Sequence, residues 1–247
     1  MPKLYVVGLG SGAGADLTQR ARAALEESQV IAGYTTYVDL VRKDFPEKEL
    51  LVSGMRGEVQ RCRAALERAA SGATVALVCS GDPGVYGMAG LVLELAQDMG
   101  LIDAVDVEVI AGVTAATGGA ALLGAPLMHD FCLVSLSDLL TPWDAIEARL
   151  RAAARAGFVI CLYNPCSHGR PDHLAHAAQI LLEELPPTCV CGIARNVGRP
   201  GEGARVLTLG ELADAPADMT SVVYVGNVTT REIAGRMVTP RGYQVRS

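Results

Sequence analysis

Short, continuously apolar segments alternate with amphipathic helical segments along this chain of 247 residues, and this alternation constrains the fold more than any other feature. Expected strands include Leu4–Gly8, Thr74–Cys79 and Val105–Ile110, and the helices between them include Glu58–Ala70 and Ala89–Asp98. Strands that are apolar at every position are typical of parallel sheets with helices on both faces. The first half of the chain therefore predicts an α/β domain with a mainly parallel sheet.

The segment Gly124-Ala125-Pro126 interrupts this pattern, and we expect two domains, residues 1–123 and 124–247. In the second, the strands Thr188–Arg195 and Arg205–Thr208 follow one another through a Gly/Pro loop, which suggests antiparallel pairing. The other expected strands are Gln29–Ala32, Phe131–Ser135, Phe158–Tyr163 and Ser221–Val225. The other expected helices are Leu17–Glu27 with Asp16 as N-cap, Tyr34–Val41, Thr114–Leu122, Trp143–Arg155, Pro171–Glu184 and Leu209–Ala213.

Charge and cysteine usage narrow the functional class. The 21 basic and 27 acidic residues give a net charge of −6 without any basic run, which disfavours nucleic acid as a partner. Apolar stretches fall far short of the roughly 20 residues of a transmembrane helix, and a strand near Met1 leads us to expect no signal peptide. Seven scattered cysteines indicate reduced thiols in a cytoplasmic protein, and the pair Cys189 and Cys191 is expected to be buried packing, not a metal site.

Glycine-rich loops follow several of the expected strands. Gly8–Gly14 passes a loose dinucleotide test, but the next strand ends in Ala32-Gly33-Tyr34, without the acidic residue that would hold a ribose. Small-residue loops also follow three other strands, at Ser80–Gly84, Ala111–Ala115 and Tyr163–Pro165. Ligands bind outside the carboxyl ends of strands in open α/β sheets, so we expect a site there, with tight turns and a helix-capping role for Asp82 as the alternatives.

These segments resemble the tetrapyrrole methyltransferases over almost the whole chain. The resemblance is carried, in matching order, by Val7–Gly12, Leu17-Thr18, Gly81–Pro83, Gly112–Ala116 and Gly124–Leu127. Ser11 departs from the family, in which many members have proline at this position. Within the family, the similarity is greatest to members that methylate C17 of a corrin precursor and contract its ring, through Ser80–Ala89, His129–Cys132, Ser135–Trp143, Leu162–Pro165 and Gly198–Glu202.

The resemblance implies a two-domain α/β enzyme with a parallel-rich N-terminal sheet, a mixed C-terminal sheet and the active site in the cleft between the domains. It also implies a homodimer and S-adenosylmethionine as cofactor. The cofactor contacts that carry over are Gly10, Ser11, Gly81, Asp82, Val85, Thr114, Ala115, Tyr163, Asn164, Val197 and Thr220.

Acid–base and charged residues supply the remaining candidates. Ring contraction needs a proton acceptor, and our catalytic candidates are His129, Ser137 and Asp138. A structural hydrogen bond or substrate positioning by His129, and N-capping of a turn by Asp138, are the alternatives. The substrate carries many carboxylates, which arginine binds bidentately, so the substrate candidates are Arg56, Ser135, Arg170, Arg195 and Arg199.

No metal site is expected. His173 and His176 lie one helical turn apart, and we interpret them as a solvated helix face. A metal-free and a cobalt-containing substrate fit the sequence equally. Another precorrin methyltransferase is an alternative within the family. Outside the family, the alternatives are a nicotinamide oxidoreductase and a non-catalytic tetrapyrrole carrier.

Overall fold

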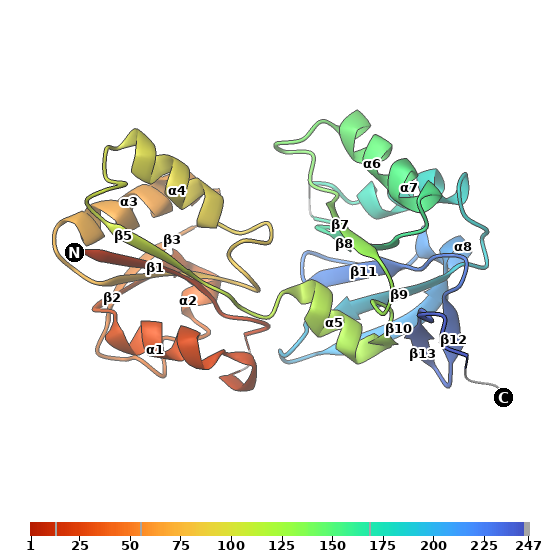
Figure 1. Ribbon diagram of the computed structural model, residues 1–247, viewed down its shortest axis with the longest axis horizontal. Coiled ribbons are helices and arrows are strands. Elements are labelled where there is room, and N and C mark those ends of the chain that lie inside the picture. The colour runs from red at the N-terminus through yellow and green to blue at the C-terminus, as the bar shows by residue number, and fades with distance from the viewer. Residues whose placement is uncertain (13, 55, 168, 245–247) are drawn as a thin grey trace. The chain divides into compact units, whose positions relative to one another are not determined.

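The computed structural model describes residues 1–12, 14–54, 56–167 and 169–244, and the chain divides into two compact units, Met1–Thr114 and Ala115–Ser247 (Figure 1). The boundary expected after residue 123 differs from this division by one helix, α5 (Ala115–Leu123). In α5, a Cβ on Gly119 would overlap Val222 and Tyr224 of the second unit, so the helix backbone rests directly on that unit's sheet. Contacts made by α5 therefore assign it to the second unit.

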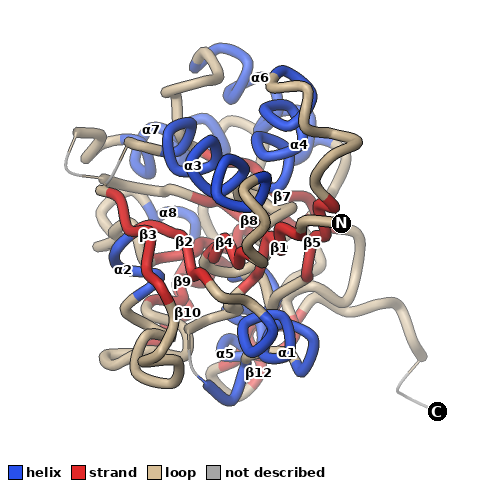
Figure 2. The backbone as a smooth tube through the Cα atoms, turned by 90° about the vertical axis from the view of Figure 1, so that its left-hand side faces the viewer, coloured by secondary structure: helices blue, strands red, loops and turns tan. Residues whose placement is uncertain are grey.

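The first unit is built on a five-stranded sheet in the order β3-β2-β4-β1-β5, with every neighbouring pair parallel. Its strands are β1 (Lys3–Gly8), β2 (Val30–Tyr34), β3 (Glu49–Ser53), β4 (Val75–Cys79) and β5 (Asp106–Ile110). Its helices are η1 (Gly14–Asp16), α1 (Gln19–Glu27), α2 (Thr35–Val38), α3 (Glu58–Ala70) and α4 (Ala89–Asp98). Figure 2 shows α3 and α4 on one face of this sheet and α1 on the other.

Strand alternation sends side chains of the first sheet into two separate cores. Val6 and Leu77 pack with α3 and α4, whereas Val7 and Val78 pack with Leu25 of α1. Because both faces are covered, the inner strands β2 and β4 are apolar throughout, and the expected parallel sheet with two covered faces is confirmed.

Two local expectations for the first unit are wrong, and one strand was missed. Helix α1 begins at Gln19 and not at Leu17, because the Thr18 hydroxyl, and not Asp16, accepts the N-cap hydrogen bond from the Ala21 amide at 3.1 Å. The helix expected over Tyr34–Val41 is only four residues long. Tyr34 is still part of β2, and the residues after Val38 form turns. Strand β3 was not expected at all; it lies at the sheet edge and is only half-buried.

The second unit holds a mixed sheet in the order β10-β9-β11-β8-β7. Its strands are β7 (Phe131–Ser135), β8 (Val159–Tyr163), β9 (Val190–Arg195), β10 (Gly203–Thr208) and β11 (Ser221–Val225). Strands β7 and β8 are parallel, and the other neighbours are antiparallel, including the expected β9–β10 pair. Helices α6 (Trp143–Arg155), α7 (His173–Leu182) and α8 (Leu209–Leu212) pack on one face, and α5 packs on the other.

A small third sheet, β12-β13-β6, joins β6 (Gly124–Ala125) to the hairpin β12 (Arg231–Ile233) and β13 (Arg236–Val238). The hairpin turns at Ala234 and Gly235, which both have positive φ, as a two-residue hairpin turn requires. Cys189 and Cys191 are both buried, as expected, and burial raises the pKa of the Cys189 thiol to about 11. Among the described residues, none of the helices has the length and apolar character needed to cross a bilayer.

Candidate active site

At the carboxyl ends of β1, β4 and β5, three loops pack backbone against backbone. We call these loops the glycine edge; they comprise Gly8–Gly12, Gly81–Val85 and Gly112–Thr114. Gly10 and Gly81 exchange two backbone hydrogen bonds, with N···O distances of 3.1 and 2.8 Å. A Cβ atom on Gly112 would overlap the carbonyl oxygen of Gly81 and the backbone of Gly8. The glycines at these positions are therefore required by the packing of the loops themselves.

Asp82 ties two loops of the glycine edge together. One carboxylate oxygen accepts the Gly84 amide at 2.7 Å, and the other accepts the Gly112 amide at 3.0 Å. Helix α4 begins only at Ala89, with Met88 at its N-cap position, so Asp82 does not cap that helix. Both oxygens hold backbone amides of the loops after β4 and β5, which fixes one loop relative to the other.

The structure brings six of the predicted cofactor residues to the glycine edge: Gly10, Ser11, Gly81, Asp82, Val85 and Thr114. The Ser11 hydroxyl donates to the Asp16 carboxylate at 2.5 Å, and the Val85 amide donates to the Asp82 carbonyl at 3.2 Å. Arg56 follows β3 at the same edge of the sheet, with a left-handed φ of 64°. These residues share an edge because all five strands run parallel.

Arg61 of α3 was not singled out from the sequence. The residue is 6% exposed, and its guanidinium donates to the Ser53 hydroxyl at 2.7 Å and to the Gly54 carbonyl at 2.8 Å. A third N–H reaches the sulfur of Met88 at 3.5 Å. Arg61 therefore anchors the segments that follow β3 and precede α4. The signal in the sequence is a charged residue in the apolar stripe of α3, four residues before Ala65.

Polar residues gather at one edge of the second sheet, because β7, β8 and β9 end there and β11 begins there. We call this the polar edge; it comprises Ser135–Asp138, Asn164–Ser167, Arg170, Asn196–Glu202 and Asp218–Thr220. It includes eight of the predicted site residues from the second unit: Ser135, Ser137, Asp138, Asn164, Arg170, Val197, Arg199 and Thr220. Two others, Tyr163 and Arg195, are the last residues of β8 and β9.

Five of these residues form a continuous network. The Ser135 hydroxyl accepts from the Asn164 side chain at 2.9 Å and from the Ser137 amide at 3.2 Å. Arg170 Nη1 donates to the Ser137 hydroxyl at 2.6 Å and lies 3.9 Å from Asp138 Oδ1. No backbone amide among the described residues bonds to the Asp138 carboxylate, so the turn-capping alternative has no support. The network joins the loop after β7 to the loop after β8.

His173 lies against this network, although the sequence predicted a solvated position. Its Nε2 atom is 3.5 Å from Asp138 Oδ2, and its side chain is only 17% exposed. The ring stacks on Trp143, with centroids 4.8 Å apart and an interplanar angle of 15°. Burial lowers the pKa of His173 below its usual value, which favours the neutral imidazole. His176, on the next turn, is exposed as expected.

Two tyrosines connect the second sheet to the start of α5. The Tyr163 hydroxyl accepts the Ala116 amide at 2.8 Å. Tyr224, which is completely buried, donates to the carbonyls of Ala115 and Ala116 at 2.9 and 2.8 Å. The predicted cofactor residues Ala115 and Tyr163 are thus neighbours in the second unit.

Arg195 is held by an acidic neighbour. Its Nε lies 2.9 Å from Asp218 Oδ2, and the Thr220 hydroxyl donates to Asp218 Oδ1 at 2.6 Å. This pairing neutralises the arginine nearest to Thr220, so Arg195 is a weaker candidate for a substrate carboxylate than the sequence indicated.

His129 lies away from the other catalytic candidates. It precedes β7, at the amino end of the strand, whereas Ser137 and Asp138 follow the carboxyl end. Five strand residues at about 3.3 Å each separate the two ends by roughly 16 Å. The ring of His129 is 47% exposed, and its Nδ1 accepts the Asp130 amide at 2.8 Å. The structure therefore does not bring His129 together with Ser137 and Asp138.

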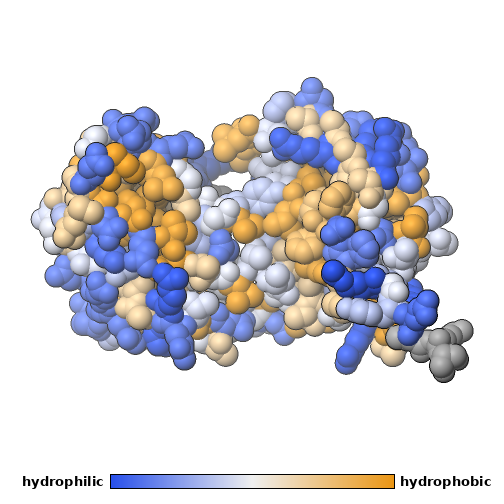
Figure 3. Space-filling model, viewed as in Figure 1, coloured by the Kyte–Doolittle hydropathy of each residue, from blue (hydrophilic) through white to orange (hydrophobic). Residues whose placement is uncertain are grey.

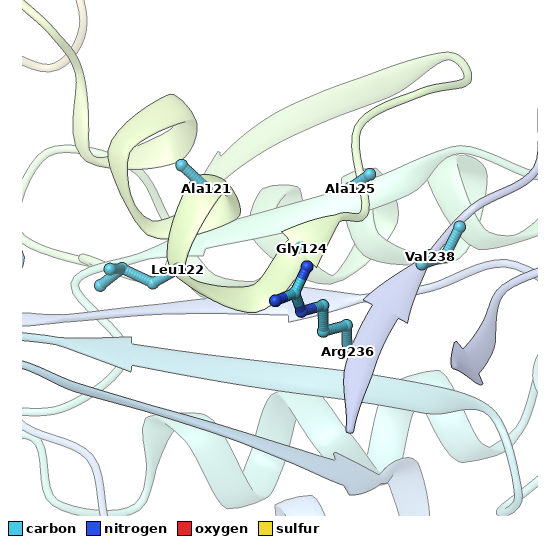
Figure 4. Close-up of a pocket in the computed structure, with 6 residues that line it drawn as sticks. All are labelled: Ala121, Leu122, Gly124, Ala125, Arg236 and Val238. Atoms are coloured by element: carbon cyan, nitrogen blue, oxygen red, sulfur yellow. The ribbon is translucent and has the colours of Figure 1, made fainter. Parts of the chain in front are cut away.

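A pocket in the second unit involves none of the predicted residues. It is lined by Ala121, Leu122, Gly124, Ala125, Arg236 and Val238 (Figure 4). Its lining is small and mostly apolar apart from the Arg236 guanidinium, and it lies among α5, β6 and β13, not at the polar edge.

Comparison with known proteins agrees with this arrangement. The family described as tetrapyrrole (corrin/porphyrin) methylases matches residues 3–213. A probable cobalt-factor III C(17)-methyltransferase of Salmonella typhimurium strain LT2 is 49% identical over 97% of this chain and 99% of its own length. A precorrin-3B C(17)-methyltransferase of Sinorhizobium sp. is 43% identical over 97% of this chain and 96% of its own.

Solved structures show the same fold. The crystal structure of the methyltransferase CobJ superposes with a TM-score of 0.91 at 38% identity, covering 97% of this chain and all of that one. A uroporphyrin-III C-methyltransferase from Thermus thermophilus, complexed with S-adenosyl homocysteine, gives 0.69 at 25% identity, covering 91% of this chain and 97% of that one. The chain belongs to the tetrapyrrole methylases, and it is a methyltransferase of this two-unit α/β fold.

Proposed function

We propose that this enzyme transfers a methyl group from S-adenosylmethionine to C17 of precorrin-3B and contracts the ring to precorrin-4, in cobalamin biosynthesis. One observation carries the proposal: the chain matches C17-methyltransferases over nearly its full length. The Salmonella relative favours a second candidate, the cobalt-containing substrate cobalt-factor III, for the same methyl transfer.

The glycine edge suits the cofactor. S-Adenosylmethionine supplies an electrophilic methyl group on a sulfonium, and in-line transfer depends mainly on positioning. Gly84 and Val113 are exposed, so backbone polar groups and small side chains of the loops are accessible to a ligand. The predicted cofactor contacts of the first unit all lie there, and the Thermus thermophilus relative was solved with the demethylated cofactor.

The polar edge suits an acidic macrocycle and a proton-transfer step. Among the described residues, the Asp138 carboxylate is contacted by the side chains of Arg170 and His173 and by no backbone amide, which leaves it available as a proton acceptor. Arg170 donates hydrogen bonds to Ser137 and Ser167, with N···O distances of 2.6 and 3.1 Å. Its guanidinium group is therefore oriented before substrate binds. Arg56 and Arg199 are the further candidates for substrate carboxylates.

The proposal includes a homodimer in the cytoplasm. All seven cysteines are free thiols, which a reducing compartment maintains. Figure 3 shows hydrophobic side chains gathered over α4 and β5 of the first unit, where Leu93, Ile102 and Val109 are exposed. Contiguous exposed apolar surface is typical of interaction sites. Sedimentation equilibrium should give twice the monomer mass of 25.8 kDa, and a monomer at micromolar concentration would contradict the dimer.

Asp82→Ala should weaken binding of S-adenosylhomocysteine by roughly 10-fold or more, because the loops after β4 and β5 lose two hydrogen bonds to a charged acceptor. Isothermal titration calorimetry measures the affinity. Asp16→Ala is the matched control, since the Asp16 carboxylate bonds to Ser11 and to no other described side chain, and its effect should be smaller. Equal affinities for Asp82→Ala and the wild type would remove Asp82 from the cofactor site.

His129→Ala should leave turnover within about two-fold of the wild type, since an exposed side chain whose partner among the described residues is its sequence neighbour, Asp130, contributes little. Initial rates of methyl transfer under saturating substrate measure this. A loss of 100-fold or more would place His129 in the mechanism in spite of its position at the amino end of β7.

Binding and product spectra together test the proposed function. Calorimetry should show S-adenosylhomocysteine binding and no binding of NAD, whereas the reverse would indicate an oxidoreductase. Supplying precorrin-3B and cobalt-factor III separately, with S-adenosylmethionine, should change the absorbance spectrum of one of them. A change only with cobalt-factor III would select the second candidate. Binding without methyl transfer to either would indicate a carrier.

A further inference from the structure

We propose that His173 is a positioning residue that holds Asp138 in place as the proton acceptor of the polar edge. The inference rests on the proposed function, because it assigns a role within the same reaction. His173 and Asp138 are 35 positions apart, and they meet because β7 and β8 are parallel neighbours whose following loops lie side by side. The 3.5 Å separation of Nε2 and Oδ2 is longer than a formed hydrogen bond, and catalytic hydrogen bonds are often long before substrate binds.

The burial of Nδ1 in His173 determines which ring nitrogen carries the proton. Nδ1 is buried and has no hydrogen-bond partner among the described residues. A proton on Nδ1 would leave a buried donor unpaired and would aim the Nε2 lone pair at a carboxylate. The Nε2–H tautomer avoids both costs. His173 therefore presents an N–H group to Asp138.

Packing fixes the direction of that N–H group. The His173 ring stacks on Trp143, the first residue of α6, and the indole N–H of Trp143 is also buried and has no hydrogen-bond partner in the described part of the chain. Rotation of the imidazole out of this plane would break the stack, so the plane of the ring is fixed, and the ring edge that faces Asp138 carries Nε2. Buried polar atoms without protein partners are rare in native proteins, and a catalytic role is one of their explanations. Two of them in one stacked pair beside Asp138 indicate that this geometry serves the site.

Burial and the charged groups around His173 together keep its imidazole neutral at physiological pH. Asp138 and Asp172 favour the imidazolium, whereas Arg170, His176 and, above all, burial oppose it. The net effect lowers the pKa of His173 below its usual value of about 6.5. When the pH falls through that lowered pKa, Nδ1 gains a buried proton and the imidazolium pairs with Asp138. A carboxylate paired with a cation is a weaker proton acceptor, so turnover should fall on the acid side.

Two substitutions of His173 separate positioning from packing. His173→Phe keeps a ring against Trp143 but removes the donor, and kcat should fall roughly 10- to 100-fold with unchanged S-adenosylhomocysteine affinity. His173→Gln places an amide N–H near the position of Nε2, so it should restore kcat to within a few-fold and remove the part of the acid-side fall that comes from His173. His176→Phe is the matched control, because His176 also stacks on Trp143 but does not approach Asp138, and its kcat should be unchanged.

Nitrogen-15 NMR of the four histidines tests the pair without any turnover. The His173 signals should show the neutral Nε2–H tautomer at pH 7, and Asp138→Asn should lower the pKa of His173 further, because a favourable charge is lost. An Nδ1–H tautomer, or normal kcat in His173→Phe, would overturn the inference. Absence of methyl transfer by the wild type would reject the proposed function instead, and the NMR result would still decide whether His173 holds Asp138.

Discussion

Gly112→Ala should destabilise the first unit by about 3 kcal/mol, the upper part of the range for overpacking, because the new Cβ would overlap backbone and not a movable side chain. Gly112 lies where the ends of β1, β4 and β5 meet, and its own amide is one of the two held by Asp82. Displacing it would separate the loops of the glycine edge. We therefore expect loss of S-adenosylhomocysteine binding together with the loss in stability.

Gly90→Ala is the matched control for this prediction. Gly90 lies in α4, is exposed, and has no atom within 4 Å of the position of a Cβ. Alanine there should raise the free energy of unfolding by about 0.5–1 kcal/mol, since alanine is the better helix former. Urea unfolding curves measure both variants. Equal midpoints for Gly112→Ala and the wild type would contradict the described packing of the glycine edge.

Asp138→Asn should lower kcat by about 10²- to 10⁴-fold, the usual contribution of a positioned proton acceptor. Asparagine preserves the shape of the side chain and can still accept a hydrogen bond, so the contacts with Arg170 and His173 lose charge but not geometry. The free energy of unfolding should change by less than about 1 kcal/mol, since the Asp138 pairs are partly exposed. Affinity for the cofactor product should stay the same.

Measuring kcat, cofactor affinity and the unfolding midpoint on the same preparation separates the possible roles of Asp138. Asp144→Asn is a matched control, because Asp144 is exposed in the first turn of α6, a few residues further on. Near-normal kcat for Asp138→Asn would exclude Asp138 as the proton acceptor. A large loss of stability would mean that its role is structural.

Strands and helices with uniform or strongly periodic apolar patterns were predicted well from the sequence. The bounds of Glu58–Ala70, Ala89–Asp98, Phe131–Ser135, Trp143–Arg155 and Ser221–Val225 are those of the structure. Strand β3 and the β12–β13 hairpin were missed, because they are short, partly exposed and lack a full apolar run. The Ala234-Gly235 turn is the one local signal that could have indicated the hairpin.

Those parts of the candidate site that depend only on the order of strands in the sheets could be predicted from the sequence. Loops after strands that end at one edge must lie close together, which places Asp82 near Gly112 and Ser135 near Asn164. His129 and Asp138 were both chosen for their acid–base side chains, although the expected strand Phe131–Ser135 lies between them and puts them at opposite ends of β7. The approach of His173 to Asp138 could not be predicted, since it depends on which strands are neighbours and on the stack with Trp143.

Methyl transfer itself provides the most direct test. The purified enzyme would be supplied with S-adenosylmethionine carrying a ¹³C-labelled methyl group, together with precorrin-3B or cobalt-factor III, and the product would be examined by NMR and mass spectrometry. The account predicts one labelled methyl group per macrocycle, attached at C17. Label at another carbon, or an unlabelled macrocycle in the presence of bound cofactor, would contradict it.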